Sequence, residues 1–420
     1  MNSLMTAGGT IGTWSTLALL ASSATAQVDQ QRAQEFFKEA QALCERDGGR
    51  LWGVSLCGPM VIADRRTQTL ATSQPAPDGP RPPVLGLVNA PVQWGGERWS
   101  AFFWDFVIAQ TPRDRGVLFI HELFHRVQPQ LGLIAPSHPN EHVDAADGRY
   151  WMRLEWRALA QALRTSGEQR KTAVRDALAF RQARRTLYPG SAETERDVEI
   201  TEGLAQYTGA VVAASSPEDA IASAVDLAAL DTVESFVRSF PTTSGVLYGL
   251  LLDATSPGWT RRIRSTDDFG ALLMQGLAVQ PATDAAAAAA RHGGAEVRAF
   301  EQQREQRRQA RIAELRRRFV DGPVLQTPGG GSAASDSRGA TVIPDVGTVW
   351  FGAYRASGNW GTLEAEKGVL VASDGSWRRV PAPQRRDSVT FYGDGWTFKA
   401  APGWVIRDGP RRGDYQVVRP

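Results

Sequence analysis

The sequence has few cysteines, little net charge and no long apolar run, and each absence excludes a class of protein. Two cysteines in 420 residues exclude a miniprotein held together by disulfides and a zinc finger built on cysteine ligands. The 47 Lys and Arg residues nearly balance the 45 Asp and Glu residues, which argues against a broad basic surface for nucleic acid. No apolar stretch reaches the roughly 18 residues that a spanning helix needs. We therefore expect a globular protein with no transmembrane segment and no nucleic-acid partner.

Residues 1–26 are typical of an export signal. A short apolar stretch precedes Ala24-Thr25-Ala26, the small-residue pattern that signal peptidase cuts, although no Lys or Arg appears before Arg32. We expect a periplasmic or secreted protein. In that compartment Cys44 and Cys57 are either paired as a disulfide or remain two buried thiols.

The remaining chain is predicted to hold two domains and a linker. Residues 27–325 read as an α+β domain, and residues 326–340, which contain a Gly-Gly-Gly-Ser tract, read as a flexible linker. Residues 341–420 alternate in hydropathy between Gly-rich turns and predict a small all-β domain. The predicted helices are residues 28–46, 150–163, 171–187, 192–212, 245–253 and 295–319; the predicted strands are 51–56, 59–63, 68–72, 84–89, 94–106, 349–354, 368–372, 388–392 and 396–400.

Two features have a plain structural interpretation beside a functional one. The Arg-rich stretch 304–318 is interleaved with Glu305 and Glu314, which is typical of a solvated amphipathic helix more than of a nucleic-acid patch. The aromatic residues of the last domain fit the core of a small β-fold, with a stacking platform for glycans or peptides as the alternative. The tryptophans concerned are Trp350, Trp360, Trp377, Trp396 and Trp404.

The strongest chemical signal is the pentapeptide His-Glu-Leu-Phe-His at residues 121–125. On a helix, His121 and His125 project from one face one turn apart, so both imidazoles can bind one Zn²⁺. Glu122 lies beside them, where it can accept a proton from the attacking water. The plain alternative is a pair of core histidines on a buried helix.

Two histidines do not complete a catalytic zinc site, which needs a third protein ligand and an open position. The favoured third ligand is Glu202, in predicted helix 192–212, because a carboxylate from a neighbouring helix can complete a His₂Glu set. Other polar groups remain candidates for ligation or for orienting a ligand: Glu155, His138, His142 and Asp144.

The pentapeptide followed by a separate Glu-Gly-x-Ala-x-Tyr helix at residues 202–207 resembles the gluzincins, zinc metallopeptidases of the peptidase MA clan. The resemblance covers residues 115–210. It implies a zincin-like domain with a small N-terminal sheet, an active-site helix and a helical C-terminal subdomain. By the same resemblance His121, His125 and Glu202 bind zinc, and Glu122 is the general base.

The resemblance also implies a Tyr or His donor for the developing oxyanion, for which Tyr248 is the candidate and a core tyrosine the alternative. The chain departs from thermolysin-like enzymes at Gln206, where they carry an Asp that orients a histidine. The Gly-x-Met-Glu-Asn signature of the large aminopeptidases is absent as well. No exopeptidase specificity follows from the resemblance.

The sequence therefore predicts an exported zinc metallopeptidase acting on a peptide or protein substrate. The alternative, from another class, is a cell-envelope binding or structural protein on a zincin scaffold without turnover. The intact Glu122 favours the enzyme, because a scaffold needs no base there. Gln206 and the unassigned β domain keep the alternative open.

Overall fold

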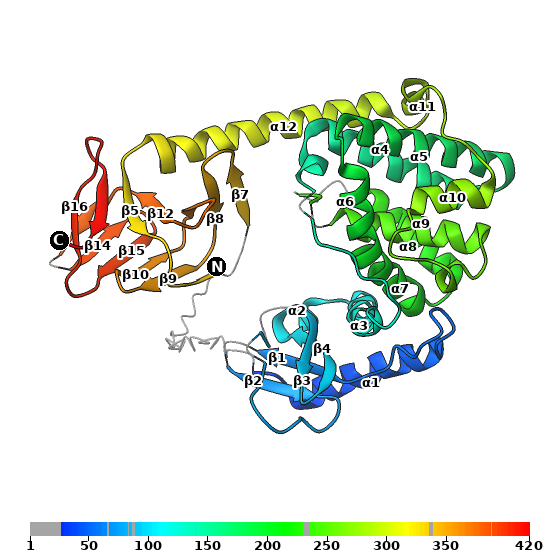
Figure 1. Ribbon diagram of the computed structural model, residues 1–420, viewed down its shortest axis with the longest axis horizontal. Coiled ribbons are helices and arrows are strands. Elements are labelled where there is room, and N and C mark those ends of the chain that lie inside the picture. Colours follow the sequence, from blue (N-terminus) through cyan, green and yellow to red (C-terminus); the bar gives the residue numbers. More distant parts are fainter. Residues whose placement is uncertain are drawn as a thin grey trace, which may run out of the picture. The chain divides into compact units, whose positions relative to one another are not determined.

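The computed structural model describes residues 27–64, 67–82, 84–85, 89–138, 140–229, 235–237, 239–335, 339–387 and 389–420. The predicted export signal at residues 1–26 lies outside them. Within these ranges no helix is both long enough and apolar enough to cross a bilayer. The architecture is mixed α+β, and the chain divides into two compact units after Gly294 (Figure 1).

The first unit combines a four-stranded sheet with a set of packed helices (Figure 1). Its elements are α1 (Gln30–Asp47), β1 (Met60–Asp64), β2 (Thr69–Thr72), β3 (Ala90–Trp94), β4 (Glu97–Phe103), α2 (Trp104–Ala109), α3 (Pro112–Val127), a 3₁₀ turn (Glu141–Asp144), α4 (Ala146–Arg164), α5 (Gly167–Leu187), α6 (Ser191–Val198), a π-helical turn (Glu199–Gly203), α7 (Leu204–Ala213), α8 (Pro217–Ala229), α9 (Phe240–Thr255), a 3₁₀ turn (Trp259–Arg261), α10 (Phe269–Leu277) and α11 (Ala285–Arg291). The predicted helices of this region are confirmed, and 192–212 runs through α6, the π-turn and α7.

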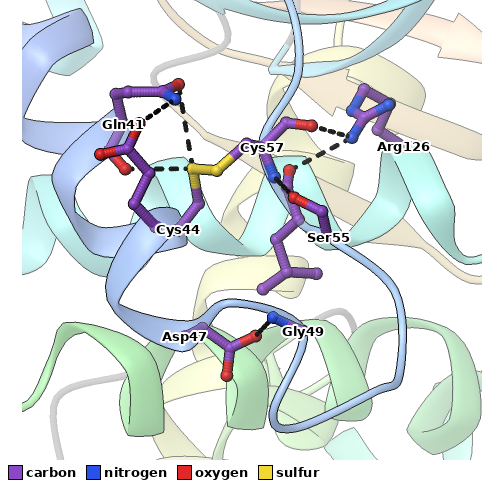
Figure 2. The surroundings of a disulfide bond; sticks show 9 residues. Gln41, Cys44, Asp47, Gly49, Ser55, Cys57 and Arg126 are labelled. Carbon is purple, nitrogen blue, oxygen red and sulfur yellow. Dashed lines mark hydrogen bonds between the residues drawn. A yellow bond between two sulfur atoms is a disulfide. The ribbon is translucent and has the colours of Figure 1, made fainter.

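A disulfide joins the end of α1 to the loop that follows it (Figure 2). Cys44 and Cys57 are paired, with their Cα atoms 5.3 Å apart, which decides between the two alternatives for these residues. The loop between them was predicted to hold a strand at 51–56, and that prediction is wrong. The Asp47 carboxylate instead accepts backbone hydrogen bonds from Gly49 and Leu51, which folds the segment into turns.

The sheet of the first unit has the strand order β2-β1-β4-β3, with β1 and β4 parallel and the other pairs antiparallel. Of the strand predicted at 84–89, residues 86–88 lie outside the described residues, and residues 84, 85 and 89 are not in a strand; β3 begins at Ala90. The strand predicted at 94–106 is in fact a hairpin turn, β4 and the start of α2. Gly95 and Gly96, both with positive φ, form that tight turn. Strand β3 lies at the edge of the described sheet.

Helix α3 lies against one face of β4. Successive side chains of a strand point to opposite faces, so Ser100 and Phe102 share a face while Trp99 lies on the other. Phe102 packs edge-on against Phe119 of α3, with ring centroids 4.8 Å apart. The Ser100 hydroxyl donates to the backbone carbonyl of Glu122 at 2.9 Å. These contacts fix the rotation of α3 relative to the sheet.

Glycines let α3, α7 and α9 approach one another closely. A Cβ atom at Gly209 of α7 would lie 2.6 Å from the backbone oxygen of Val117 in α3. A Cβ at Gly245 of α9 would collide with the backbone of Gly203 at the end of the π-turn. Any larger residue at these crossings would push the helices apart. The crossings bring the π-turn to the side of α3.

The second unit consists of a long helix and two sheets (Figure 1). The sheets have the strand orders β13-β14-β15-β10-β9-β6 and β16-β17-β5-β12-β11-β8-β7. The elements are α12 (Gly294–Arg316), a π-turn (Arg317–Asp321), β5 (Val324–Pro328), β6 (Ser332–Ser335), β7 (Ala340–Ile343), β8 (Gly347–Trp350), β9 (Tyr354–Gly358), β10 (Gly361–Ala365), β11 (Val369–Ala372), β12 (Trp377–Pro381), β13 (Arg385–Arg386), β14 (Thr390–Gly393), β15 (Trp396–Ala400), β16 (Val405–Asp408) and β17 (Tyr415–Val418).

Tryptophans form part of the core of this β-region. Trp360 and Trp396 are buried with Leu363 and Phe398, whereas Trp350 and Trp404 pack against that core and are partly buried. The predicted helix 295–319 is confirmed, and its end packs through Leu315 and Phe319 on Ile343, Val349 and Leu370. Of the strands predicted here, 349–354 is interrupted between β8 and β9, and the other three correspond to β11, β14 and β15.

The segment predicted as a flexible linker, 326–340, contains the end of β5 and the whole of β6. Its glycines serve a tight turn between these strands: Gly330 and Gly331 have positive φ. A Cβ on Gly331 would also collide with the Ser357 carbonyl of β9, the strand that pairs with β6. Close backbone approach, and not chain flexibility, therefore explains the glycine run at this position.

Candidate metal centre

The three predicted ligands converge at the junction of α3 and the π-turn. His121 and His125 lie one helical turn apart, with their Nε2 atoms 3.0 Å from each other. One carboxylate oxygen of Glu202 lies 3.5 Å from each of these nitrogens. The ligand atoms of the three residues all lie within 4.8 Å of one another, as a shared metal ion requires.

The π-turn aims Glu202 at the two histidines. Its i→i+5 geometry is marked by the Leu204 amide, which donates to the Glu199 carbonyl. One residue more per turn rotates the following side chains relative to a regular α-helix, and such turns are frequent at functional sites. The sequence predicted a helix here and gave no signal for its widened turn.

Two glutamine amides orient the imidazoles. The Nδ1 atom of His121 lies 3.1 Å from the Gln206 side-chain oxygen, and Nδ1 of His125 lies 2.7 Å from that of Gln128. An Nδ1–H donated to an amide oxygen leaves the Nε2 lone pair free for a metal ion. Gln206 therefore occupies the orienting position at which an Asp was expected, so the departure leaves His121 with a partner.

Gln128 also ties the two halves of the cluster together. Its amide nitrogen donates to the backbone carbonyls of Ile200 and Thr201 in the π-turn, both at 3.1 Å. The side chain therefore links His125 on α3 to the turn that carries Glu202. Sequence reasoning missed Gln128, which caps the end of α3 three residues after His125.

Glu122 is buried beside the cluster and incompletely bonded. It is 5% exposed, and its Oε2 atom has no hydrogen-bond partner among the described residues. Burial raises the pKa of this carboxyl group, against the opposing effect of His121 and His125. A buried carboxylate without a partner costs free energy, so its retention here suits a group that acts on a bound molecule.

The charges of the ligands are coupled. Burial alone would raise the pKa of Glu202, but its hydrogen bonds to both histidines hold the pKa well below the usual range. Burial would lower the pKa of His125, and the bond to Glu202 reverses that and raises it. An ionised carboxylate with two imidazoles is a donor set that fits Zn²⁺ better than Ca²⁺ or Mg²⁺, which prefer oxygen ligands.

A cavity of about 340 Å³ opens over the cluster. The start of the edge strand β3 forms one wall, β4 contributes Arg98, and the segment after α3 forms another wall. The lining residues are Asn89, Ala90, Pro91, Arg98, His121, Glu122, His125, Gln128, Pro129, Ile134, Thr201 and Glu202.

Comparisons of the chain with protein-family models, with curated proteins and with solved structures found no match. The chemistry of this cavity therefore has to be inferred from its own residues.

The structure does not bring Tyr248 to the cluster. This tyrosine is fully buried, and its hydroxyl donates to a carboxylate oxygen of Glu155 at 2.7 Å. In the described structure it does not line the cavity, so it has the core position that was the alternative. Burial raises its pKa well above the usual value.

The other candidate ligands are bonded to residues outside the cluster. Glu155 accepts hydrogen bonds from Arg181 and Arg184, and His142 lies 2.9 Å from Glu195. Asp144 accepts the backbone N–H of Phe236, and His138 lies 3.1 Å from Asp197. In the parts of the chain that are described, Glu202 is the carboxylate that joins the two histidines.

Proposed function

We propose that this protein is a zinc-dependent hydrolase of the gluzincin type that cleaves peptide bonds. What supports the proposal is the convergence of His121, His125 and Glu202 beside the buried, incompletely bonded Glu122 in one open cavity. A structural zinc site is closed by four protein ligands, whereas a catalytic site keeps one position open for water or substrate. Three ligands, a base and an opening match the catalytic kind.

In this proposal the chain's residues divide the work of hydrolysis. Zn²⁺ held by His121, His125 and Glu202 would lower the pKa of a water molecule and polarise the substrate carbonyl. Glu122 takes a proton from the attacking water and returns it to the leaving amine. Gln128 and Gln206 hold the imidazoles in the tautomer that leaves Nε2 unprotonated.

The position of β3 supports a peptide as the substrate. Among the described strands β3 pairs with β4 alone, so its other edge offers backbone N–H and C=O groups. An extended peptide can add to such an edge by backbone hydrogen bonds. Asn89, Ala90 and Pro91, at the start of the strand, line the cavity beside the cluster.

Export to the periplasm or the cell exterior is part of the same proposal. Its support is the export-signal pattern at residues 1–26 and the disulfide between Cys44 and Cys57. Disulfides persist in oxidising compartments and are rare in the reducing cytosol.

The first test measures zinc per chain in the purified protein after extensive dialysis, together with cleavage of a peptide library. We expect about one zinc ion per chain, bound tightly enough to survive dialysis at neutral pH. Glu202→Ala should lose both zinc and cleavage, whereas Glu193→Ala, at an exposed residue of α6, should lose neither. Zinc without any cleavage would favour the non-catalytic scaffold, and no zinc after reconstitution would refute the metal site.

A further inference from the structure

Arg98 lies on the face of β4 that is turned toward α3. Arg98, Ser100 and Phe102 alternate with Trp99 and Ala101, so they share one face of the strand. Phe102 contacts Phe119, and Ser100 bonds the carbonyl of Glu122, one helical turn further along α3. Arg98 continues this series, which places it beside the turn of α3 that carries His125.

The cavity lining bears out this placement, because Arg98 borders the same cavity as Glu122 and His125. Within the described chain, the side chain of Arg98 forms no hydrogen bond or ion pair, and Arg98 is the one Arg or Lys residue that lines the cavity. An arginine side chain keeps its charge at any physiological pH and carries five N–H donors. Arg98 therefore brings a positive charge to the border of the cavity that Glu122 and His125 also line.

The neighbours of Arg98 do not neutralise it. The guanidinium of Arg126 donates to the backbone carbonyls of Leu56 and Cys57, which are neutral acceptors (Figure 2). Glu97 is adjacent in β4, but its carboxylate accepts from the Gln74 amide and alternation turns it to the other face.

Two acidic residues, Glu122 and Glu202, line the cavity. Glu202 bonds the two histidines, and Glu122 is buried against α3. With zinc bound, a divalent cation and the Arg98 guanidinium would face these two carboxylates, which leaves a net positive cavity. Such a cavity attracts and orients an anionic group of the substrate.

We propose that Arg98 binds a carboxylate of the substrate, so that the enzyme prefers peptides with an acidic residue next to the scissile bond. The carboxylate can be an Asp or Glu side chain or the free C-terminus of the peptide. This inference rests on the proposed peptidase function and names the substrate class of the same site. Arg98 is a specificity-determining residue, and Glu122 remains the base.

The test uses the full-length zinc-loaded protein and a positional library of acetylated, amidated peptides. Each peptide carries Glu, Gln or Lys at one position, and a second set with free C-termini distinguishes a terminal carboxylate from a side chain. We expect kcat/KM for Glu peptides, or for free termini, to exceed that of their neutral counterparts about ten- to hundredfold, the usual worth of a charged hydrogen bond. Arg98→Gln should abolish the preference and Arg98→Glu should reverse it toward Lys. Arg175→Glu, at an exposed residue of α5 that makes the same change in net charge, should retain it.

An unchanged carboxylate preference in Arg98→Glu would overturn the inference, as would equal cleavage of charged and neutral peptides by the unmodified protein. If no peptide is cleaved, the proposed function fails, and binding then decides the inference. Calorimetry on Glu122→Gln protein should show tighter binding of carboxylate peptides than of neutral ones, and adding Arg98→Glu should remove the difference. Equal or undetectable binding of the two peptide sets would refute a carboxylate site at Arg98.

Discussion

Two clusters of ionisable side chains lie at opposite ends of a single π-turn, and they differ in how fully they are bonded. Glu202, near the end of the turn, belongs to the candidate metal cluster with His121 and His125, and its side chain is 43% exposed. Glu199, at its start, belongs to a buried ion network and is 1% exposed. The same short segment therefore supplies one open site and one closed site.

In the buried network each carboxylate is bonded to an arginine. Arg181 donates to Glu199, to Glu155 and to Asp268. Arg184 donates to Glu155 and bonds Glu195 through two nitrogens, at 2.7 and 3.0 Å. Charges that are paired and hydrogen-bonded in this way act as structure. Beside the candidate metal ligands, by contrast, one oxygen of Glu122 has no hydrogen-bond partner among the described residues, and the imidazoles border a cavity.

The difference separates a functional cluster from a structural one on physical grounds. A shifted pKa alone would select both clusters, because the pKa of Glu122 is raised by burial and the pKa of Glu195 is lowered by its charged neighbours. The bonding of the carboxylates separates the two clusters. Glu155, Glu195 and Glu199 each accept hydrogen bonds from an arginine. One oxygen of Glu122 has no partner among the described residues, and Glu122 borders the same cavity as the two imidazoles. Four measurements sharpen or break this comparison.

The largest effect is expected for Glu122→Gln. Loss of the base should lower kcat about 10²- to 10⁴-fold, while zinc stays bound. The free energy of unfolding should not fall, because a neutral isostere replaces a buried carboxylate with an unpaired oxygen. Kinetics, metal analysis and urea unfolding measure the three quantities. Glu141→Gln, at an exposed position, serves as the control, and full activity in Glu122→Gln would sink the assignment of the base.

Arg184→Met should have the opposite profile. Removing this fully buried guanidinium leaves Glu155 and Glu195 under-compensated, and breaking a buried pair costs about 3–5 kcal/mol of unfolding free energy. The zinc stoichiometry of the folded fraction should stay unchanged. Urea unfolding compares it with Arg175→Met, an exposed residue of the same helix that should change stability little. A loss below about 1 kcal/mol would show that the network is not what closes this region.

Gln128→Met tests the link between helix α3 and the π-turn that carries Glu199 and Glu202. It removes both the acceptor for His125 and the donors to the Ile200 and Thr201 carbonyls. Zinc affinity should fall about ten- to hundredfold, the usual effect of losing a group that orients a ligand. Competition with a chelator measures it, and the exposed Gln130→Met is the matched control. Gln128→Glu keeps the acceptor and loses the donors, so unchanged affinity in that variant would mean that only the contact to His125 matters.

The sequence predicted the metal cluster more completely than its surroundings. His121 and His125 at i, i+4 spacing and a Glu on a separate helix are residue types that bind metal ions, so His121, His125 and Glu202 could be predicted as ligands from the sequence. Gln128 could not be singled out, because a glutamine after a helix has many ordinary roles. The π-turn depends on the packing of Gly203 against Gly245, which no local pattern reveals.

The errors in the fold arose where backbone hydrogen bonding outweighed hydropathy. The apolar run at 51–56 suggested a strand, but Asp47 and the disulfide fold that segment into turns. The glycines at 329–331 suggested a linker, whereas they permit close contact between strands. Tyr248 was the candidate oxyanion donor that the gluzincin resemblance implied, and only the tertiary structure shows its bond to Glu155.

The smallest effect concerns the pH dependence of the closed cluster. Burial alone would raise the pKa of Glu195, but Arg184 in particular, with His142 and Arg185, holds it well below its usual range. A carboxyl group with a depressed folded-state pKa stabilises the fold above its unfolded pKa of about 4.3, and that contribution is lost as the pH falls toward the folded value. The penalty of Glu195→Gln should therefore shrink below pH of about 4.3, by up to about 1.4 kcal/mol per pH unit. Urea unfolding across this range measures the difference in unfolding free energy from the unmodified protein. Glu168→Gln, at an exposed residue, is the control, and its difference should stay nearly constant across the same pH range. Burial raises the pKa of Glu199, so the contribution of Glu199 to stability varies with pH in the opposite direction. A penalty for Glu195→Gln that does not vary with pH would mean that Arg184 fails to outweigh burial at Glu195.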